Sequence, residues 1–144
     1  MGDLRIIKAS AQTTGMFGRV MTSVRGQHFL LDASGGRDGV PSECPNAGEV
    51  FLQSLAGCGT VIVESAARKR DIRLDSLRLT VESAKQKEHP ELYTWIRIGF
   101  RLAGPTQAEA EELVGVFQAE CPIYRLAKLG STVSVEVVAE PARP

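Results

Sequence analysis

The hydrophobic positions in the middle of the chain repeat with the period of a helix. Over residues 47–70 the apolar side chains are spaced by four, three and four residues and share one helical face. The residues that mark this face are Phe51, Leu55, Cys58 and Ile62. Further apolar residues widen it until little polar surface remains before Glu64. We therefore expect a long helix that is buried on most sides, in the core or against a second subunit.

The pattern before this helix is typical of strands. Residues 4–33 are rich in side chains that favour strands, with turns expected over residues 13–18 and 25–27. Residues 34–46 contain several Gly and Pro residues and are expected to form a loop.

After the helix, residues 77–84 and 93–102 alternate apolar and polar side chains and are expected to pair as a hairpin. Thr106 is a suitable N-cap for a helix that runs to about Ala119. A shorter helical segment and a final strand over residues 132–138 follow. Because no strand–helix–strand alternation runs throughout, this order predicts an α+β fold with an antiparallel sheet.

The size and charge of the chain narrow the class of protein. Its 144 residues predict a single domain over residues 1–144. The 17 basic and 17 acidic residues balance, which argues against nucleic-acid binding through a basic surface. No apolar run approaches the roughly 20 residues of a membrane span, and the first residues lack the apolar stretch of a signal peptide. We expect a cytoplasmic protein without a membrane partner.

Cysteine is the main candidate for chemistry. The chain has three cysteines, Cys44, Cys58 and Cys121, with no CxxC pair and only two His. This set argues against a structural zinc site, so no metal is expected. In a reducing compartment a free cysteine is either a small buried hydrophobe or a chemical group. Cys44, beside Pro45 in the loop, is interpreted as incidental.

Cys121 has the stronger local argument. Pro is favoured at the first position of a helix, so Pro122 would make Cys121 the N-cap. The first backbone N–H groups would then point at the sulfur and favour its anionic, nucleophilic form. Arg125, one turn later, would add positive charge. Cys is not a preferred capping residue, which favours a functional reading over an accidental one.

Cys58 taken alone is more typical of a small core residue, because it lies on an apolar face. To react it needs positive charge from elsewhere, and Arg19, Arg25 and Arg37 are candidates. Glu49 opens the helix, about 13 Å along the axis from Cys58 and half a turn away. It is therefore too far to act as the direct base in the same subunit, although it could hold an arginine or reach a neighbouring site.

Two cysteine motifs resemble those of the OsmC/Ohr family, named for osmotically inducible protein C and organic hydroperoxide resistance. Residues 44–58 match the loop and helix that lead to the first family cysteine, and residues 120–123 match its second, a Cys-Pro that starts a helix. The order of elements matches over nearly the whole chain. The resemblance implies an OsmC-like fold with a long central helix, in an intertwined homodimer with its active sites at the subunit interface.

The resemblance also implies reduction of organic hydroperoxides without a metal or organic cofactor. Cys58 would attack the peroxide and become a sulfenic acid, Cys121 would form a disulfide with it, and a cellular thiol reductant would restore both. Arg19 is the nearest match to the family arginine that stabilises the thiolate. The family glutamate that holds this arginine lies ten residues before the cysteine; that position is Gly48 here, and Glu49 follows it, as in a less-characterised OsmC-like branch.

Two other interpretations remain open from the sequence. The first is a non-enzymatic module that binds a small apolar or thiol-reactive ligand at the dimer interface, which Gly48 favours slightly. The second is a scaffold in which all three cysteines are structural. The two paired cysteines favour the enzyme over both.

Overall fold

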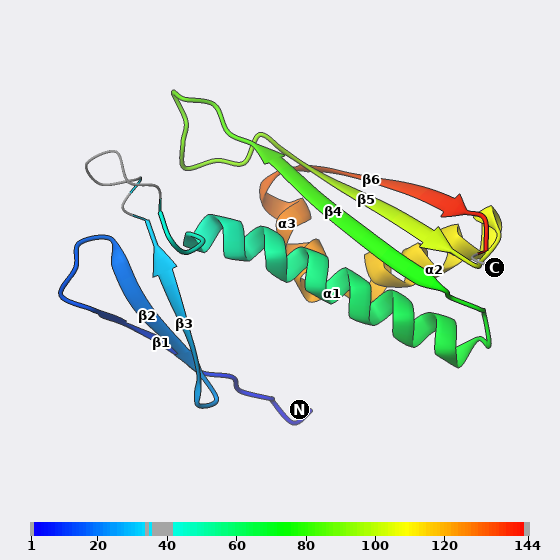
Figure 1. Cartoon of the computed structure of the whole chain (residues 1–144), viewed down its shortest axis with the longest axis horizontal. Coiled ribbons are helices and arrows are strands. Elements are labelled where there is room, and N and C mark those ends of the chain that lie inside the picture. The colour runs from blue at the N-terminus through cyan, green and yellow to red at the C-terminus, as the bar shows by residue number, and fades with distance from the viewer. Residues whose placement is uncertain (1, 34, 36–41, 143–144) are drawn as a thin grey trace. The chain divides into compact units, whose positions relative to one another are not determined.

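The computed structural model of the chain describes residues 2–33, 35 and 42–142 and forms two compact units, Met1–Phe51 and Leu52–Pro144 (Figure 1). Six strands and three helices are defined within these residues. In chain order they are β1 (Ala9–Thr13), β2 (Arg19–Val24), β3 (Gln27–Asp32), α1 (Ala47–Lys69), β4 (Ser76–Ala84), β5 (Trp95–Ala103), α2 (Gln107–Glu120), α3 (Pro122–Gly130) and β6 (Thr132–Glu140). All the predicted helices and strands are present, and their ends differ by a few residues.

The first unit is built on an antiparallel sheet in the order β1-β2-β3. A two-residue turn joins β2 to β3, with positive φ angles at Arg25 (50°) and Gly26 (75°). These angles match the primed hairpin turns whose twist suits paired strands. Both predicted turns of this region are confirmed. Of the predicted loop over residues 34–46, residues 34 and 36–41 lie outside the described part of the chain.

This small sheet has little core of its own. Every residue of β1 is exposed, and β2 is half-buried along its length. Large apolar side chains of the unit lie in solvent, including Ile6 (86% exposed), Phe17 (82%) and Phe29 (59%). Asp32, by contrast, is a carboxylate that is only 2% exposed. The unit therefore combines uncovered apolar surface with a buried charge.

The second unit contains the sheet β4-β5-β6. β4 pairs antiparallel with β5, as predicted for the hairpin. β6 pairs parallel with β5, so the expectation of an antiparallel sheet is wrong for this pair of strands. The reason is that α2 and α3 follow β5 in sequence and return the chain to the end of the sheet where β5 begins. Two parallel strands require such a connection.

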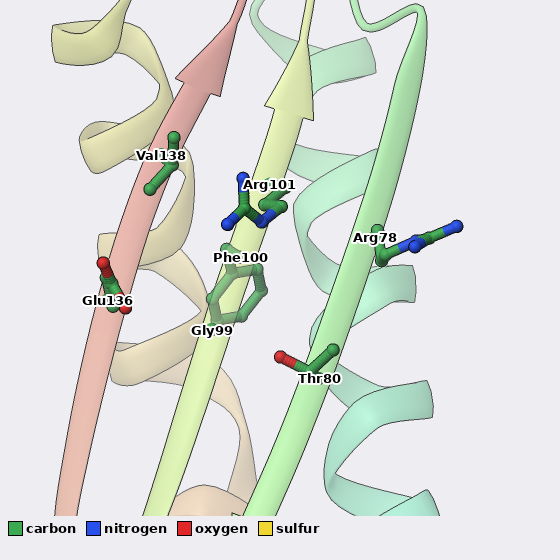
Figure 2. Close-up of a pocket in the computed structure, with 7 residues that line it drawn as sticks. All are labelled: Arg78, Thr80, Gly99, Phe100, Arg101, Glu136 and Val138. Atoms are coloured by element: carbon green, nitrogen blue, oxygen red, sulfur yellow. The ribbon is translucent and has the colours of Figure 1, made fainter.

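The core of this unit lies on one side of the sheet. Four alternate residues of β5, Ile96, Ile98, Phe100 and Leu102, are buried, whereas Arg97 and Arg101 between them are exposed. α1 and α2 cover the buried side, as the view from the open side in Figure 2 shows. Phe117 of α2 packs against Phe100 with ring centroids 5.2 Å apart. This alternation reflects the period of two along a strand.

The buried stripe of α1 runs through Leu55, Gly59 and Val63 and not through the centre of the predicted face. Gly59 accounts for the shift. A Cβ at this position would lie 2.5 Å from Leu79 Cδ1 and 3.2 Å from the Phe100 ring. The absence of a side chain lets the helix approach the sheet closely, and Cys58 consequently lies at the margin of the packed face. The expectation that α1 is buried on most sides does not hold within a single chain, where Val61 is 61% exposed.

By length and composition alone, α1 is long and apolar enough to cross a membrane. Its apolar residues do not form one continuous run, because Ser, Thr, Gly and Cys interrupt them. The core helix of a soluble protein passes the same test. Leu55 and Val63 of α1 are completely buried, whereas most of the other residues of the helix are half-buried or exposed.

Candidate functional site

Cys58 and Cys121 come together in the second unit although 63 residues separate them in sequence. Their sulfur atoms lie 2.9 Å apart, within hydrogen-bonding distance, and both are free thiols. A disulfide bond is about 2.05 Å long, so less than about 1 Å of movement separates this pair from a bond. The pair is therefore arranged for reversible disulfide formation.

Local chemistry fixes the position of Cys121. It ends α2 and caps α3, with Pro122 at the first helical position, as predicted. The Tyr124 backbone N–H donates to the Cys121 sulfur at 3.4 Å, and the cysteine is fully buried. Tyr124 is in turn held by Phe117, with ring centroids 5.0 Å apart, and accepts a hydrogen bond from Gln118 at its hydroxyl. The Cys121 sulfur thus satisfies one of the free N–H groups at the start of α3.

Cys58 has the opposite environment. It is half-buried at the margin of the packed face of α1. Burial, together with the hydrogen bond to Cys121 and the charge of that sulfur, raises the pKa of the Cys58 thiol to about 12. Either thiol can donate in this pair, and these effects leave the proton on Cys58. Without positive charge from elsewhere, Cys58 is therefore a weak nucleophile at neutral pH.

Arg19 lies in the first unit, between two carboxylates. Its Nε donates to Asp32 Oδ2 at 3.2 Å, and its Nη2 donates to Glu43 Oε2 at 2.6 Å. The hydrogen bond to Asp32 contributes most to raising the pKa of Arg19, although burial of the guanidinium opposes it and Glu43 adds to it. These contacts make a charge cluster of Arg19, Asp32 and Glu43.

Glu49 is engaged at the start of α1. Its Oε2 accepts the Asn46 backbone N–H at 2.8 Å, while Asn46 Oδ1 accepts the Glu49 N–H at 3.0 Å. This reciprocal pair is a capping box, which satisfies two free N–H groups of the helix. In the described part of the first unit, the carboxylates on Arg19 are thus Asp32 and Glu43, and Glu49 has a helix-capping contact.

Sequence reasoning missed Asp32 and Glu43. The available signal was the antiparallel hairpin, because its register places Arg19 directly opposite Asp32. No comparable signal exists for Glu43, whose separation of 24 residues from Arg19 spans the loop. Of the other candidates, Cys44 is half-buried, Arg25 lies in the β2–β3 turn, and Arg37 lies outside the described residues.

No group of three or more His, Cys, Asp or Glu side chains that could hold a metal ion occurs among residues 2–33, 35 and 42–142. A shallow hollow of about 100 Å³ lies on the open side of the β4-β5-β6 sheet (Figure 2). Gly99 leaves room for it between Thr80 and Glu136, and Arg101 stands beside it. In Figure 2 the Arg78 side chain extends away from β5. The two cysteines do not line this hollow.

Comparisons with known proteins agree with this arrangement. A family model described as OsmC-like protein matches residues 39–136. No functionally curated protein matches the chain. Among the solved structures that share its fold are three proteins at 12%, 16% and 22% sequence identity. A hypothetical protein from Aquifex aeolicus has a TM-score of 0.83 at 12% identity, over 97% of this chain and all of that one.

The other two structures are named for the same family. An OsmC-like protein from Mycoplasma pneumoniae has a TM-score of 0.76 at 16% identity, over 99% of this chain and 100% of that one. An organic hydroperoxide resistance protein OsmC from Legionella pneumophila has a TM-score of 0.70 at 22% identity, over 95% of this chain and 99% of that one. At such identities the likeness concerns the fold.

Proposed function

Because the chain belongs to the OsmC-like protein family, we propose that it is a thiol-dependent peroxidase that reduces organic hydroperoxides through Cys58 and Cys121. The observation that carries the proposal is the 2.9 Å separation of the two sulfur atoms. The structural relative from Legionella pneumophila, described as an organic hydroperoxide resistance protein, supports the choice of substrate.

The proposed reaction has two thiol steps. The Cys58 thiolate attacks one peroxide oxygen, the O–O bond breaks, and the other oxygen leaves as an alcohol after taking up a proton. Cys58 is thereby oxidised to a sulfenic acid. Cys121 then attacks the Cys58 sulfur, water leaves, and a disulfide forms. A cellular thiol reductant supplies the two electrons that restore both thiols.

The raised pKa of Cys58 requires a cation for the first step. We assign this role to Arg19, as the family resemblance implies, from whichever subunit it comes. A guanidinium beside the sulfur would favour the thiolate and oppose the effect of burial. The role predicted for Glu49 as the holder of this arginine stays a prediction, since its carboxylate caps α1.

The same proposal includes a cytoplasmic homodimer of one domain per chain. The exposed apolar residues of the first unit, such as Ile6 and Phe29, support an assembled state in which a second copy covers them. A three-stranded sheet with so little core gains stability from such cover. The proposed partners are the hydroperoxide, the thiol reductant and a second copy of the chain.

Consumption of cumene hydroperoxide by the reduced protein, with dithiothreitol as reductant, tests the proposal. We expect Cys58→Ser to abolish turnover. Cys44→Ser is the matched control, because it removes a thiol outside the sulfur pair of Cys58 and Cys121. It should keep the wild-type rate. Turnover that survives in Cys58→Ser would contradict the proposal.

The pKa of Cys58 also favours a second candidate function, because a thiol that keeps its proton suits binding better than attack. In this alternative the protein binds a small apolar or thiol-reactive ligand without turnover. Binding of such a probe would saturate, would consume no peroxide and would persist in Cys121→Ser. The peroxidase requires the opposite: turnover that depends on Cys121.

A further inference from the structure

Arg19 is held unequally by its two carboxylates. Asp32 is 2% exposed, whereas the side chain of Glu43 is 63% exposed. An ion pair with an exposed partner contributes little to holding a side chain, because water and salt compete with it. A buried carboxylate is costly without a cation, so the contact between Asp32 and Arg19 resists opening.

The backbone fixes the same pair. Arg19 and Asp32 are cross-strand partners in β2 and β3, so the sheet itself brings their side chains together. The Ala33 N–H donates to the Gly18 carbonyl at 2.9 Å, so the backbone hydrogen bonds between the two strands continue beyond Arg19 and Asp32. The Asp32 N–H donates to the Pro45 carbonyl at 3.2 Å, which ties β3 to the segment before α1. Asp32 is thus anchored through both its backbone and its carboxylate.

The charge of the cluster constrains how Arg19 can serve a thiolate. Two carboxylates already contact the guanidinium, so a thiolate gains little attraction from Arg19 while both contacts persist. Asp32 contacts Nε, Glu43 contacts Nη2, and Met16 Sδ lies 3.8 Å from Nη1. The exposed Glu43 contact is the one that can exchange for another anion while Nε stays held.

We propose that Asp32 is the positioning residue for Arg19, and that Glu43 occupies the guanidinium only until a thiolate replaces it. This inference rests on the proposed peroxidase function, because it assigns Arg19 to the Cys58 thiolate. Asp32 holds Arg19 in place of the family glutamate, whose position is Gly48 in this chain. Asp32 affects the Cys58 sulfur only through Arg19.

The test is the pH dependence of Cys58 alkylation by monobromobimane in the full-length Cys44→Ser protein, with the labelled peptide identified by mass spectrometry. We expect Asp32→Asn to slow the reaction at pH 7 by roughly tenfold and to shift its profile to higher pH, as Arg19→Met does. Glu43→Gln, the matched carboxylate-to-amide change, should alter the rate by less than about fivefold. A structural role alone would not shift the profile.

A double variant separates positioning from an independent effect. Asp32→Asn should add nothing to Arg19→Met, because Asp32 acts only through the arginine. A wild-type profile in folded Asp32→Asn, or an equal further loss in the Arg19→Met background, overturns the inference. If Asp32→Asn does not fold, Arg19→Lys replaces it as the test. It keeps the charge but lacks the Nε–H, so we expect a loss of about tenfold; an unchanged profile overturns the inference.

Peroxide consumption by the same preparations distinguishes the two proposals. If alkylation follows the expected pattern but no hydroperoxide is consumed, the peroxidase proposal fails and the role of Asp32 stands. If consumption depends on Cys58 and Arg19 but not on Asp32, the peroxidase stands and the positioning role fails.

Discussion

The sulfur pair and the charge cluster are built by different physics. Cys58 and Cys121 are brought together by a packed core, in which helix ends and aromatic rings fix the sulfur atoms. Arg19, Asp32 and Glu43 are brought together by strand register and ion pairs in a small sheet with little core. The first arrangement gives proximity but leaves Cys58 protonated; the second holds a cation but neutralises it.

Neither region alone is a complete site for the proposed peroxidase reaction. A buried thiol without a cation is inert, and an arginine between two carboxylates is already satisfied. The proposed chemistry requires the two regions to act on each other in the assembled protein.

The largest effect is expected from removing the cation. Arg19→Met should lower the rate of Cys58 sulfenic acid formation at pH 7 by at least about tenfold, because each unit of pKa is a tenfold change in thiolate. Dimedone trapping after a cumene hydroperoxide pulse measures this rate. Arg25→Met is the matched control from the neighbouring turn and should react like the wild type. Equal losses in both variants would mean that Arg19 has no specific role.

Disturbing the packing that supports the sulfur pair should have the next largest effect. Gly59→Ala would place a methyl group 2.5 Å from Leu79 Cδ1, so we expect a loss of about 1–3 kcal/mol in unfolding free energy. Gly57→Ala meets no atom within 4 Å in the protomer and should gain about 0.5–1 kcal/mol. Urea unfolding measures both. A destabilised Gly57→Ala would instead indicate that a partner subunit covers that position.

The pH dependence of stability tests the pKa of Cys58 without peroxide. In reduced Arg19→Met the folded thiol should keep its proton up to about pH 12, whereas the unfolded thiol loses it near pH 8.5. The unfolded state is then favoured as pH rises through this window, and stability should fall by about 1–2 kcal/mol between pH 8 and 10. The loss should disappear when Cys58→Ser is added. An identical loss in that double variant would assign it to other groups.

The smallest effect is expected at Glu49. Glu49→Ala removes half of the capping box and should cost about 0.5–1 kcal/mol of stability, as measured by thermal unfolding. Glu49→Gln keeps an acceptor for the Asn46 N–H and should cost less. If the capping contact is its main role, both variants retain the peroxidase rate. A loss of rate in both would restore Glu49 as a holder of the arginine.

The sequence predicts the sulfur pair better than the charge cluster, for a physical reason. Cys121-Pro122 is a local signal, because an N-cap and the first helical residue are adjacent in sequence. The period of α1 likewise predicted the helix, although the close packing at Gly59 moved its buried stripe away from Cys58. Such a shift depends on the neighbouring sheet, which the pattern within one helix does not contain.

The cluster depends on contacts between distant residues. Arg19 meets Asp32 across a hairpin and Glu43 across a loop, so no single stretch of sequence contains the arrangement. Glu49 was a candidate because it is an acidic residue at the start of a helix. Helix capping alone explains an acidic residue at that position. The parallel pairing of β6 was missed for a similar reason, since it depends on the path of two intervening helices.

Mass spectrometry of the reduced protein after one equivalent of cumene hydroperoxide tests directly whether Cys58 and Cys121 react as a pair. Because the two sulfur atoms lie 2.9 Å apart, we predict a Cys58–Cys121 disulfide within each chain and a free Cys44. In Cys121→Ser the same pulse should leave a sulfenic acid on Cys58 that dimedone traps. Peroxide that leaves both thiols unmodified, or a disulfide that joins Cys44 in place of either, would contradict the account.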